Sequence, residues 1–279
     1  MHLIALRACG CTIRIECADE AIRELIELAF GALIVPLFGP RSDETGRYQI
    51  ERDNTGQRFC VRDFDGLVAH IDDADTLLWH LDKSLTIALQ HQRPDLYFVH
   101  AAAVALAGGV GVLAAPPGTG KSTLTVGLLE RGFTYLSDEL APIDVGTGLV
   151  HRYAHAVSLK SRPPDAIRLP QGTVAIGRRF HMPTRLFSVA GEEPLPLVAF
   201  IFPERSSEPS AACRRIGPSV GAAHLVANGL NALAHPNDGL DVAVALARHV
   251  PCFQVNIGDL SAACAAIEGV MTAAHSASG

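Results

Sequence analysis

The chain of 279 residues is long enough for one large domain or two smaller ones, and its 48% hydrophobic content suffices for a packed core. Its net charge of −6 argues against a duplex nucleic-acid partner, and no apolar run approaches the ~20 residues of a membrane-spanning helix. The seven scattered cysteines are typical of reduced thiols, and the N-terminus does not resemble a signal peptide, so we expect a cytoplasmic protein.

Residues 1–95 are expected to form a small N-terminal α/β module. Short strands are predicted at 12–16, 47–52, 58–62 and 67–71. Asp19 stands where it can cap a first helix, and Asp72 or Asp73 where it can cap a second one with leucines along one face. These residues contain no catalytic constellation, which favours a structural or partner-binding role.

Residues 97–114 are typical of a β-hairpin with a tight turn at Gly108-Gly109. This register would pair Ala107 with Val110 and would place His100 opposite Pro117. His100 is therefore a candidate site residue, although a lone histidine is also a common core or surface residue.

The segment from Ala115 to Thr123 has the pattern of a phosphate-binding loop between an apolar strand and a helix. Glycines let backbone N–H groups turn toward phosphate oxygens, and the following helix adds the positive end of its dipole. The lysine supplies a charge for the outer phosphates, and the serine hydroxyl can bind Mg²⁺. The expected phosphate-binding residues are Pro117, Gly118, Thr119, Gly120, Lys121, Ser122 and Thr123.

A second strand, over 133–136, is followed directly by Asp138 and Glu139. A right-handed crossover would lay this strand parallel to the strand before the loop. The acidic pair would then lie at the same sheet edge as the loop, facing the γ-phosphate and its metal. The alternative is an acidic turn without a catalytic role.

With these residues in place, the sequence resembles the HPr kinase/phosphorylase family, in particular HPr-kinase-related proteins such as lasso-peptide kinases. The runs that carry the resemblance are 98–104, 115–122, 130–133 and 136–139. It implies a P-loop kinase fold of the phosphoenolpyruvate carboxykinase type, with a mixed central sheet and flanking helices. It also implies ATP- and Mg²⁺-dependent phosphorylation of a serine hydroxyl. By motif position, His100 is the active-site histidine and Asp138 the catalytic aspartate.

The sequence departs from the family pattern in three places. Ala115 stands where the family has glycine, and Glu139 where it has a second aspartate near the metal. We do not find the later segment that supports phosphate-driven dephosphorylation. The reverse activity, and HPr itself as the acceptor, are therefore not carried over to this chain.

The rest of the chain is less informative. Lys160 and Arg162 could neutralise phosphate charge at the sheet edge or form a surface pair, and 163–191 could hold a loop over the site. Arg205 follows a buried strand at what could be the same edge. The remaining predicted elements are a strand at 195–202, helices at 220–234, 240–249 and 260–271, and a strand at 252–256.

The sequence thus predicts an N-terminal module at 1–95 and a kinase domain at 96–279 that uses ATP and Mg²⁺. Ser122 and Glu139 would hold the metal, Lys121 the phosphates, and Asp138 would accept the proton of the incoming hydroxyl. By resemblance, the acceptor is a serine of a peptide or small protein. A small-molecule kinase, or a regulatory or assembly protein that binds ATP without catalysis, stays open, as does a homo-oligomer. No membrane partner is expected.

Overall fold

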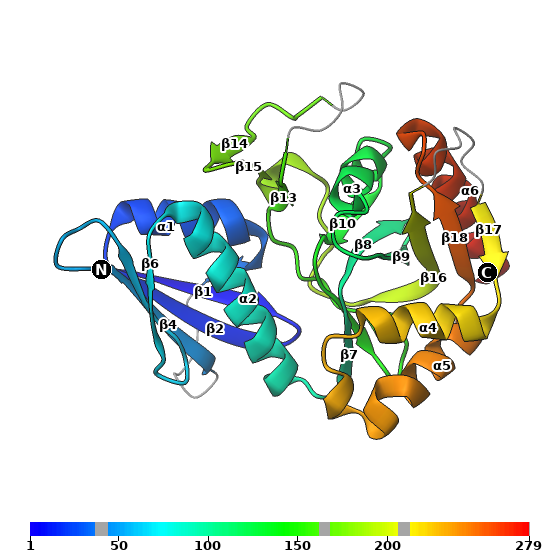
Figure 1. The fold of residues 1–279 in the computed structure, drawn as a ribbon, viewed down its shortest axis with the longest axis horizontal. Coiled ribbons are helices and arrows are strands. Elements are labelled where there is room, and N and C mark those ends of the chain that lie inside the picture. Colours follow the sequence, from blue (N-terminus) through cyan, green and yellow to red (C-terminus); the bar gives the residue numbers. More distant parts are fainter. Residues whose placement is uncertain (37–43, 162–167, 206–212, 279) are drawn as a thin grey trace. The chain divides into compact units, whose positions relative to one another are not determined.

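The computed structural model describes residues 1–36, 44–161, 168–205 and 213–278. Over these residues the chain is a mixed α/β protein that divides into two compact units (Figure 1). The first unit comprises Met1–Arg93 and Ala154–Leu186, and the second comprises Pro94–Tyr153 and Phe187–Gly279. The predicted phosphate-binding segment therefore lies in the second unit.

A six-stranded sheet forms the centre of the first unit. Across this sheet the order is β3 (Ile34–Val35), β1 (His2–Ala8), β2 (Cys11–Cys17), β4 (Glu44–Arg52), β5 (Phe59–Arg62) and β6 (Val68–Ile71). The turn residues between β1 and β2, Cys9 and Gly10, both have positive φ, which matches the twist of a two-residue hairpin. β1 has no counterpart among the strands that we expected from the sequence.

Both helices of the first unit begin at aspartates that the sequence identified. Asp19 accepts a hydrogen bond of 2.9 Å from the backbone N–H of Ile22 at the start of α1 (Glu20–Phe30). Asp73 does the same for Thr76 at the start of α2 (Ala74–Gln92). Each cap satisfies an otherwise unbonded N–H of the first turn, which contributes about 1 kcal/mol.

The segment Ala154–Leu186 belongs to the first unit, not to the C-terminal domain in which the sequence-based boundaries placed it. Its described elements are β13 (Val157–Leu159), β14 (Val174–Ile176), β15 (Arg179–Met182) and the 3₁₀ turn Thr184–Leu186, and the three strands form a small sheet. Ala156 N–H donates to Ala29 O at 2.6 Å, and His181 Nε2 lies 3.5 Å from Asp75 Oδ1 on α2. These contacts join positions far apart in sequence, which local patterns do not encode.

The second unit is built on a larger mixed sheet. Its main path runs β10 (Thr134–Ser137), β8 (Ala101–Leu106), β9 (Gly109–Ala114), β16 (Leu195–Glu204), β12 (Leu149–Val150), β11 (Ala141–Asp144) and β7 (Leu96–Val99). β18 (Cys252–Asn256) also pairs with β16, and β17 (Cys213–Ile216) pairs with β18. The pairs β9–β16 and β16–β18 are parallel, whereas β8–β9 and β8–β10 are antiparallel.

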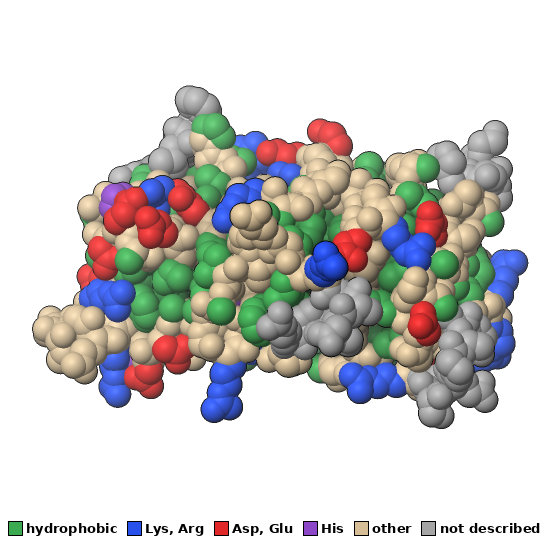
Figure 2. Space-filling view, turned by 90° about the horizontal axis from the view of Figure 1, so that it is seen from above, with side chains coloured by type: hydrophobic (Ala, Val, Ile, Leu, Met, Phe, Trp, Pro, Cys, Tyr) green, Lys and Arg blue, Asp and Glu red, His purple; other side chains and the backbone are tan. Residues whose placement is uncertain are grey.

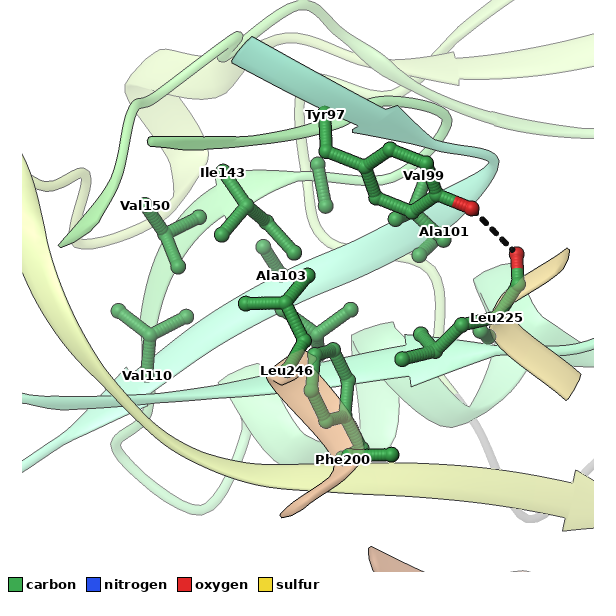
Figure 3. Close-up of a cluster of buried hydrophobic side chains, with 14 of the residues drawn as sticks. Tyr97, Val99, Ala101, Ala103, Val110, Ile143, Val150, Phe200, Leu225 and Leu246 are labelled. Atoms are coloured by element: carbon green, nitrogen blue, oxygen red, sulfur yellow. Dashed lines mark hydrogen bonds between the residues drawn. The ribbon is translucent and has the colours of Figure 1, made fainter. Parts of the chain in front are cut away.

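Helices cover both faces of this second sheet. On one face, α3 (Lys121–Leu129) and α6 (Leu260–Ser278) pack against Ala102, Val104 and Leu113. On the opposite face, α4 (Pro218–Asn228) and α5 (Leu240–His249) pack against the residues of β8 and β9 that alternate with these in sequence. Figure 3 shows the buried cluster on the α4 and α5 face, in which the Tyr97 hydroxyl donates to Leu225 O at 3.2 Å. Alternate residues of β8 and β9 thus face alternate helical layers, as the pleat of a strand requires.

The predicted helix over 220–234 is shorter in the structure. α4 ends at Asn228, and the chain then forms two 3₁₀ turns, Ala232–Ala234 and Pro236–Gly239. The last helix is longer than predicted, since α6 extends to Ser278. None of the described helices combines the length and the apolarity needed to cross a membrane. On the face drawn in Figure 2, acidic and basic side chains lie interspersed among hydrophobic and neutral ones.

The β8–β9 hairpin exists, but the predicted register was wrong. Leu106 pairs with Gly109, so the turn residues are Ala107 and Gly108, with φ of 51° and 86°. Gly109 is the first residue of β9, and an added Cβ there would come within 2.8 Å of Val198 Cγ1. Continuing this pairing places His100 opposite Ala115, not Pro117. A shift of two positions keeps every side chain on its original face, so His100 still lies beside the loop.

Candidate functional site

A strand, a loop and a helix surround the predicted phosphate-binding segment. The loop begins after β9 and ends at Gly120, the N-cap of α3, whose φ is 109°. Gly118 also has positive φ, at 83°, a region that favours glycine. Thr119 closes the turn, because its hydroxyl donates to Pro116 O at 2.8 Å. Among the described residues, no side chain caps the N-terminus of α3, and the helix dipole places a partial positive charge at this end of the loop.

Lys121, the first residue of α3, is only 7% exposed. Its Nζ lies 3.5 Å from the carbonyl oxygens of both His100 and Ala115. These are the residues that the corrected hairpin register sets opposite each other. The ammonium group is thus held by backbone at the junction of loop and hairpin, at the edge where a phosphate would bind.

His100 lies where the predicted continuous strand breaks into β7 and β8. Its backbone N–H leaves the ladder and donates to Asn228 O at 2.8 Å. Its Nδ1 lies 3.2 Å from Glu139 O and 3.3 Å from Glu139 Oε2. Both partners are acceptors, so Nδ1 carries the hydrogen in this arrangement.

The strand that carries the acidic pair runs in the predicted direction but has a different neighbour. β10 pairs with β8, and β8 separates it from β9. Because both of these pairings are antiparallel, β9 and β10 run the same way, and both carboxyl ends lie at one edge of the sheet. The acidic pair and the loop therefore share this edge.

The two acidic residues have different surroundings. Asp138 is 1% exposed, and its Oδ1 lies 3.3 Å from the hydroxyl of Thr125 on α3. Glu139 has a side chain that is 37% exposed and contacts His100. The sequence analysis did not identify Thr125, although its position one turn after Lys121 on a helix facing the acidic strand could have indicated it.

Of the cations whose role the sequence left open, Arg205 lies at the site. It follows β16, and its Nε donates to the carbonyl O of Thr119 in the loop at 3.2 Å. Lys160 belongs to the first unit, and Arg162 lies outside the described residues. The predicted loop over 163–191 is likewise described only from residue 168, and its strands β14 and β15 are part of the first unit.

Two cysteines of the second unit are excluded as nucleophiles. Burial raises the pKa of both Cys252 and Cys264 to about 11, so each thiol is protonated at neutral pH. Cys264 packs on α3, where its sulfur comes within 2.9 Å of the position that a Cβ on Gly127 would take.

The residues at the loop fit a magnesium ion that is shared with phosphates. Mg²⁺ prefers oxygen ligands and is commonly held by one or two carboxylates together with substrate phosphates. Ser122 and Glu139 supply a hydroxyl and a carboxylate, both partly exposed. In the part of the chain that the structure describes, no three His, Cys, Asp or Glu side chains form a metal-binding cluster. This donor set fits a cation that arrives with a nucleotide.

No protein-family model matches the sequence, and no curated protein matches it either. Among solved structures, the chain is similar to the HPr(Ser) kinase/phosphatase from Coxiella burnetii, with a TM-score of 0.34 and 14% identity. The alignment covers 65% of this chain and 91% of that one. The function is inferred below from the residues of this chain.

Proposed function

We propose that the second unit is an ATP-dependent kinase that transfers the γ-phosphate to a hydroxyl group. The observation that carries this proposal is the convergence of a glycine loop, a buried lysine and an acidic pair at one sheet edge. Phosphoryl transfer needs mainly positioning and neutralisation of charge, and these groups supply both.

The loop and its cations would bind the nucleotide. The N–H groups of residues 118–123 would surround the phosphate oxygens, and Lys121 would leave its two carbonyl partners to contact the outer phosphates. Arg205, already in contact with Thr119 O, would add a second cation beside the loop. Ser122 and Glu139 would hold Mg²⁺, which would neutralise phosphate charge.

Asp138 would accept the proton of the incoming hydroxyl, and His100 would orient the acidic pair through Glu139. In the chain alone Asp138 is almost completely covered, so an acceptor can reach it only after neighbouring side chains move. The acceptor that we propose is a serine of a peptide or small protein.

Single-turnover transfer from γ-labelled ATP tests the proposal. Serine-containing peptides, small alcohols and water would be offered in parallel, with wild-type protein and the variant Asp138→Asn. We expect label on a peptide serine with wild-type protein, and a rate lower by about 10²–10⁴-fold in the variant. Label only on a small alcohol would favour a small-molecule kinase. The burial of Asp138 also fits a regulatory protein, for which ATP would bind without transfer to any acceptor.

A further inference from the structure

One buried hydroxyl connects the helix after the loop with the acidic end of β10. The Oγ1 atom of Thr125 lies 3.0 Å from the carbonyl O of Lys121 and 3.3 Å from Asp138 Oδ1. Thr125 has no exposed surface, and Asp138 is 1% exposed. Water therefore does not compete for this hydroxyl, and the geometry of the carboxylate depends on protein groups.

The second contact of Thr125 is not a consequence of helix geometry. A threonine in a helix often donates to the carbonyl one turn earlier, which here is that of Lys121. The approach to Asp138 is additional, because it joins α3 to a different element. A threonine hydroxyl has one proton, so it donates to one of these two oxygens at a time, and it can accept a hydrogen bond from the Asp138 carboxyl group only when that group is protonated.

We propose that Thr125 is a positioning residue that holds the Asp138 carboxylate at the phosphate-binding edge, an inference that rests on the proposed kinase function. While Asp138 is ionised, the Thr125 hydroxyl donates to Oδ1. Once Asp138 has taken up a proton, the hydroxyl donates to the Lys121 carbonyl and accepts from the carboxyl group. Thr125 keeps its own proton throughout.

The transfer step balances with Asp138 as the only protein group that changes protonation. The O–H bond of the acceptor breaks and its proton moves to Asp138. The acceptor oxygen forms a bond to the γ-phosphorus, and the bond between that phosphorus and the bridging oxygen of ADP breaks. Thr125 acts through Asp138, which stays aligned in both protonation states.

The first test is a ¹³C NMR titration of the aspartate carboxyl groups in the ligand-free protein, with the Asp138 signal assigned by its loss in Asp138→Asn. Thr125→Val and Thr125→Ala remove the hydroxyl, whereas Thr125→Ser keeps it. The charged or titratable groups at the site, Lys121 on α3, His100 between β7 and β8, and Glu139 after Asp138, are the same in all variants.

We expect the titration midpoint of the Asp138 carboxyl to rise by about one pH unit in Thr125→Val and Thr125→Ala, a tenfold change in its ionisation constant, because a donor to the charged form is lost. Thr125→Ser should titrate like the wild-type protein. Equal midpoints in the serine and alanine variants, which differ only in the hydroxyl, would overturn the proposal.

The second test is the pH profile of phosphate release from labelled ATP to water, with Thr86→Val on α2 as a control for the loss of a buried threonine hydroxyl. The acidic limb should move to higher pH in Thr125→Val, with serine restoring it. A uniform fall in rate at every pH would show a merely structural role. If wild-type protein binds ATP but never transfers phosphate, the kinase function fails, whereas the NMR comparison still decides the role of Thr125.

Discussion

Asp138 and Glu139 are neighbours in sequence but lie in different environments. Asp138 is buried against α3, whereas the Glu139 side chain is 37% exposed and pairs with His100. A buried carboxylate suits a base that acts after water has been excluded, and a half-exposed one suits a metal ligand that exchanges with solvent. The two residues should therefore respond differently to amide substitution.

We expect Asp138→Asn to lower single-turnover transfer by about 10²–10⁴-fold at every Mg²⁺ concentration, because an amide does not accept a proton at neutral pH. Glu139→Gln should show a defect that eases as Mg²⁺ is raised, since a weakened metal site can be filled by mass action. Rates measured across a Mg²⁺ series check both. Parallel Mg²⁺ responses of the two variants would show that the roles are assigned wrongly.

His100→Ala should lower the transfer rate more than it lowers the affinity for ATP. The imidazole contacts Glu139 through Nδ1, whereas the backbone carbonyl of His100 lies next to Lys121 Nζ, so the alanine variant keeps this backbone contact and loses the carboxylate partner. Calorimetric ATP titration and single-turnover transfer, measured on the same protein, separate the two effects. A loss of affinity as large as the loss of rate would place His100 in phosphate binding instead.

At the scale of elements, the β8–β9 turn holds an alanine in a left-handed conformation. This conformation costs a non-glycine residue about 1–2 kcal/mol. Glycine would remove that cost, but it loses more backbone entropy on folding, which offsets part of the gain. Ala107→Gly should therefore stabilise the protein by about 0.5–1 kcal/mol.

Gly109→Ala should destabilise the protein by about 1–3 kcal/mol, because Val198 occupies the space that a Cβ would need. Denaturant unfolding of both variants checks this, and a stabilising Gly109→Ala would contradict the observed register.

The site and the elements around it differ in how far the sequence alone defines them. The helix caps at Asp19 and Asp73, the loop and the acidic strand end follow from side-chain chemistry within a few residues. The hairpin register did not follow, because the close approach of Val198 to Gly109 comes from β16, which is remote in sequence. Thr125 was missed for the same reason, since its contact with Asp138 joins two elements.

The small sheet of the first unit contains a histidine that should make the protein sensitive to acid. His181 is 5% exposed, and burial lowers its pKa from 6.5 although Asp75 opposes the shift. Between the two pKa values the unfolded chain binds the proton and the folded chain does not, so stability falls as pH drops below about 6.5. His181→Gln should weaken this loss. The measurement is thermal unfolding between pH 7 and pH 5, with the exposed His70→Gln as control; an unchanged pH dependence in His181→Gln would contradict this assignment.

At the scale of the whole molecule, the chain leaves the first unit at Arg93 and returns to it for Ala154–Leu186. A division at residue 95 follows the sequence pattern but separates this returning segment from its partners on α1 and α2. A fragment of residues 96–279 should consequently unfold less cooperatively than the full chain, because the returning segment loses its packing partners. Calorimetric unfolding of the two proteins would show this, and a single sharp transition in the fragment would argue against it.

We propose that the loop around Lys121 binds the phosphates of ATP. Calorimetric titration of the full chain with Mg-ATP tests it most directly, with Lys121→Ala as the variant and Lys83→Ala, an exposed lysine on α2, as the matched control. We predict saturable binding by the wild-type protein and by Lys83→Ala, and a loss of affinity of at least about tenfold in Lys121→Ala, since a charge-assisted contact contributes about 1.5–3 kcal/mol. Equal affinities in all three proteins, or no binding in any, would contradict phosphate binding by this loop.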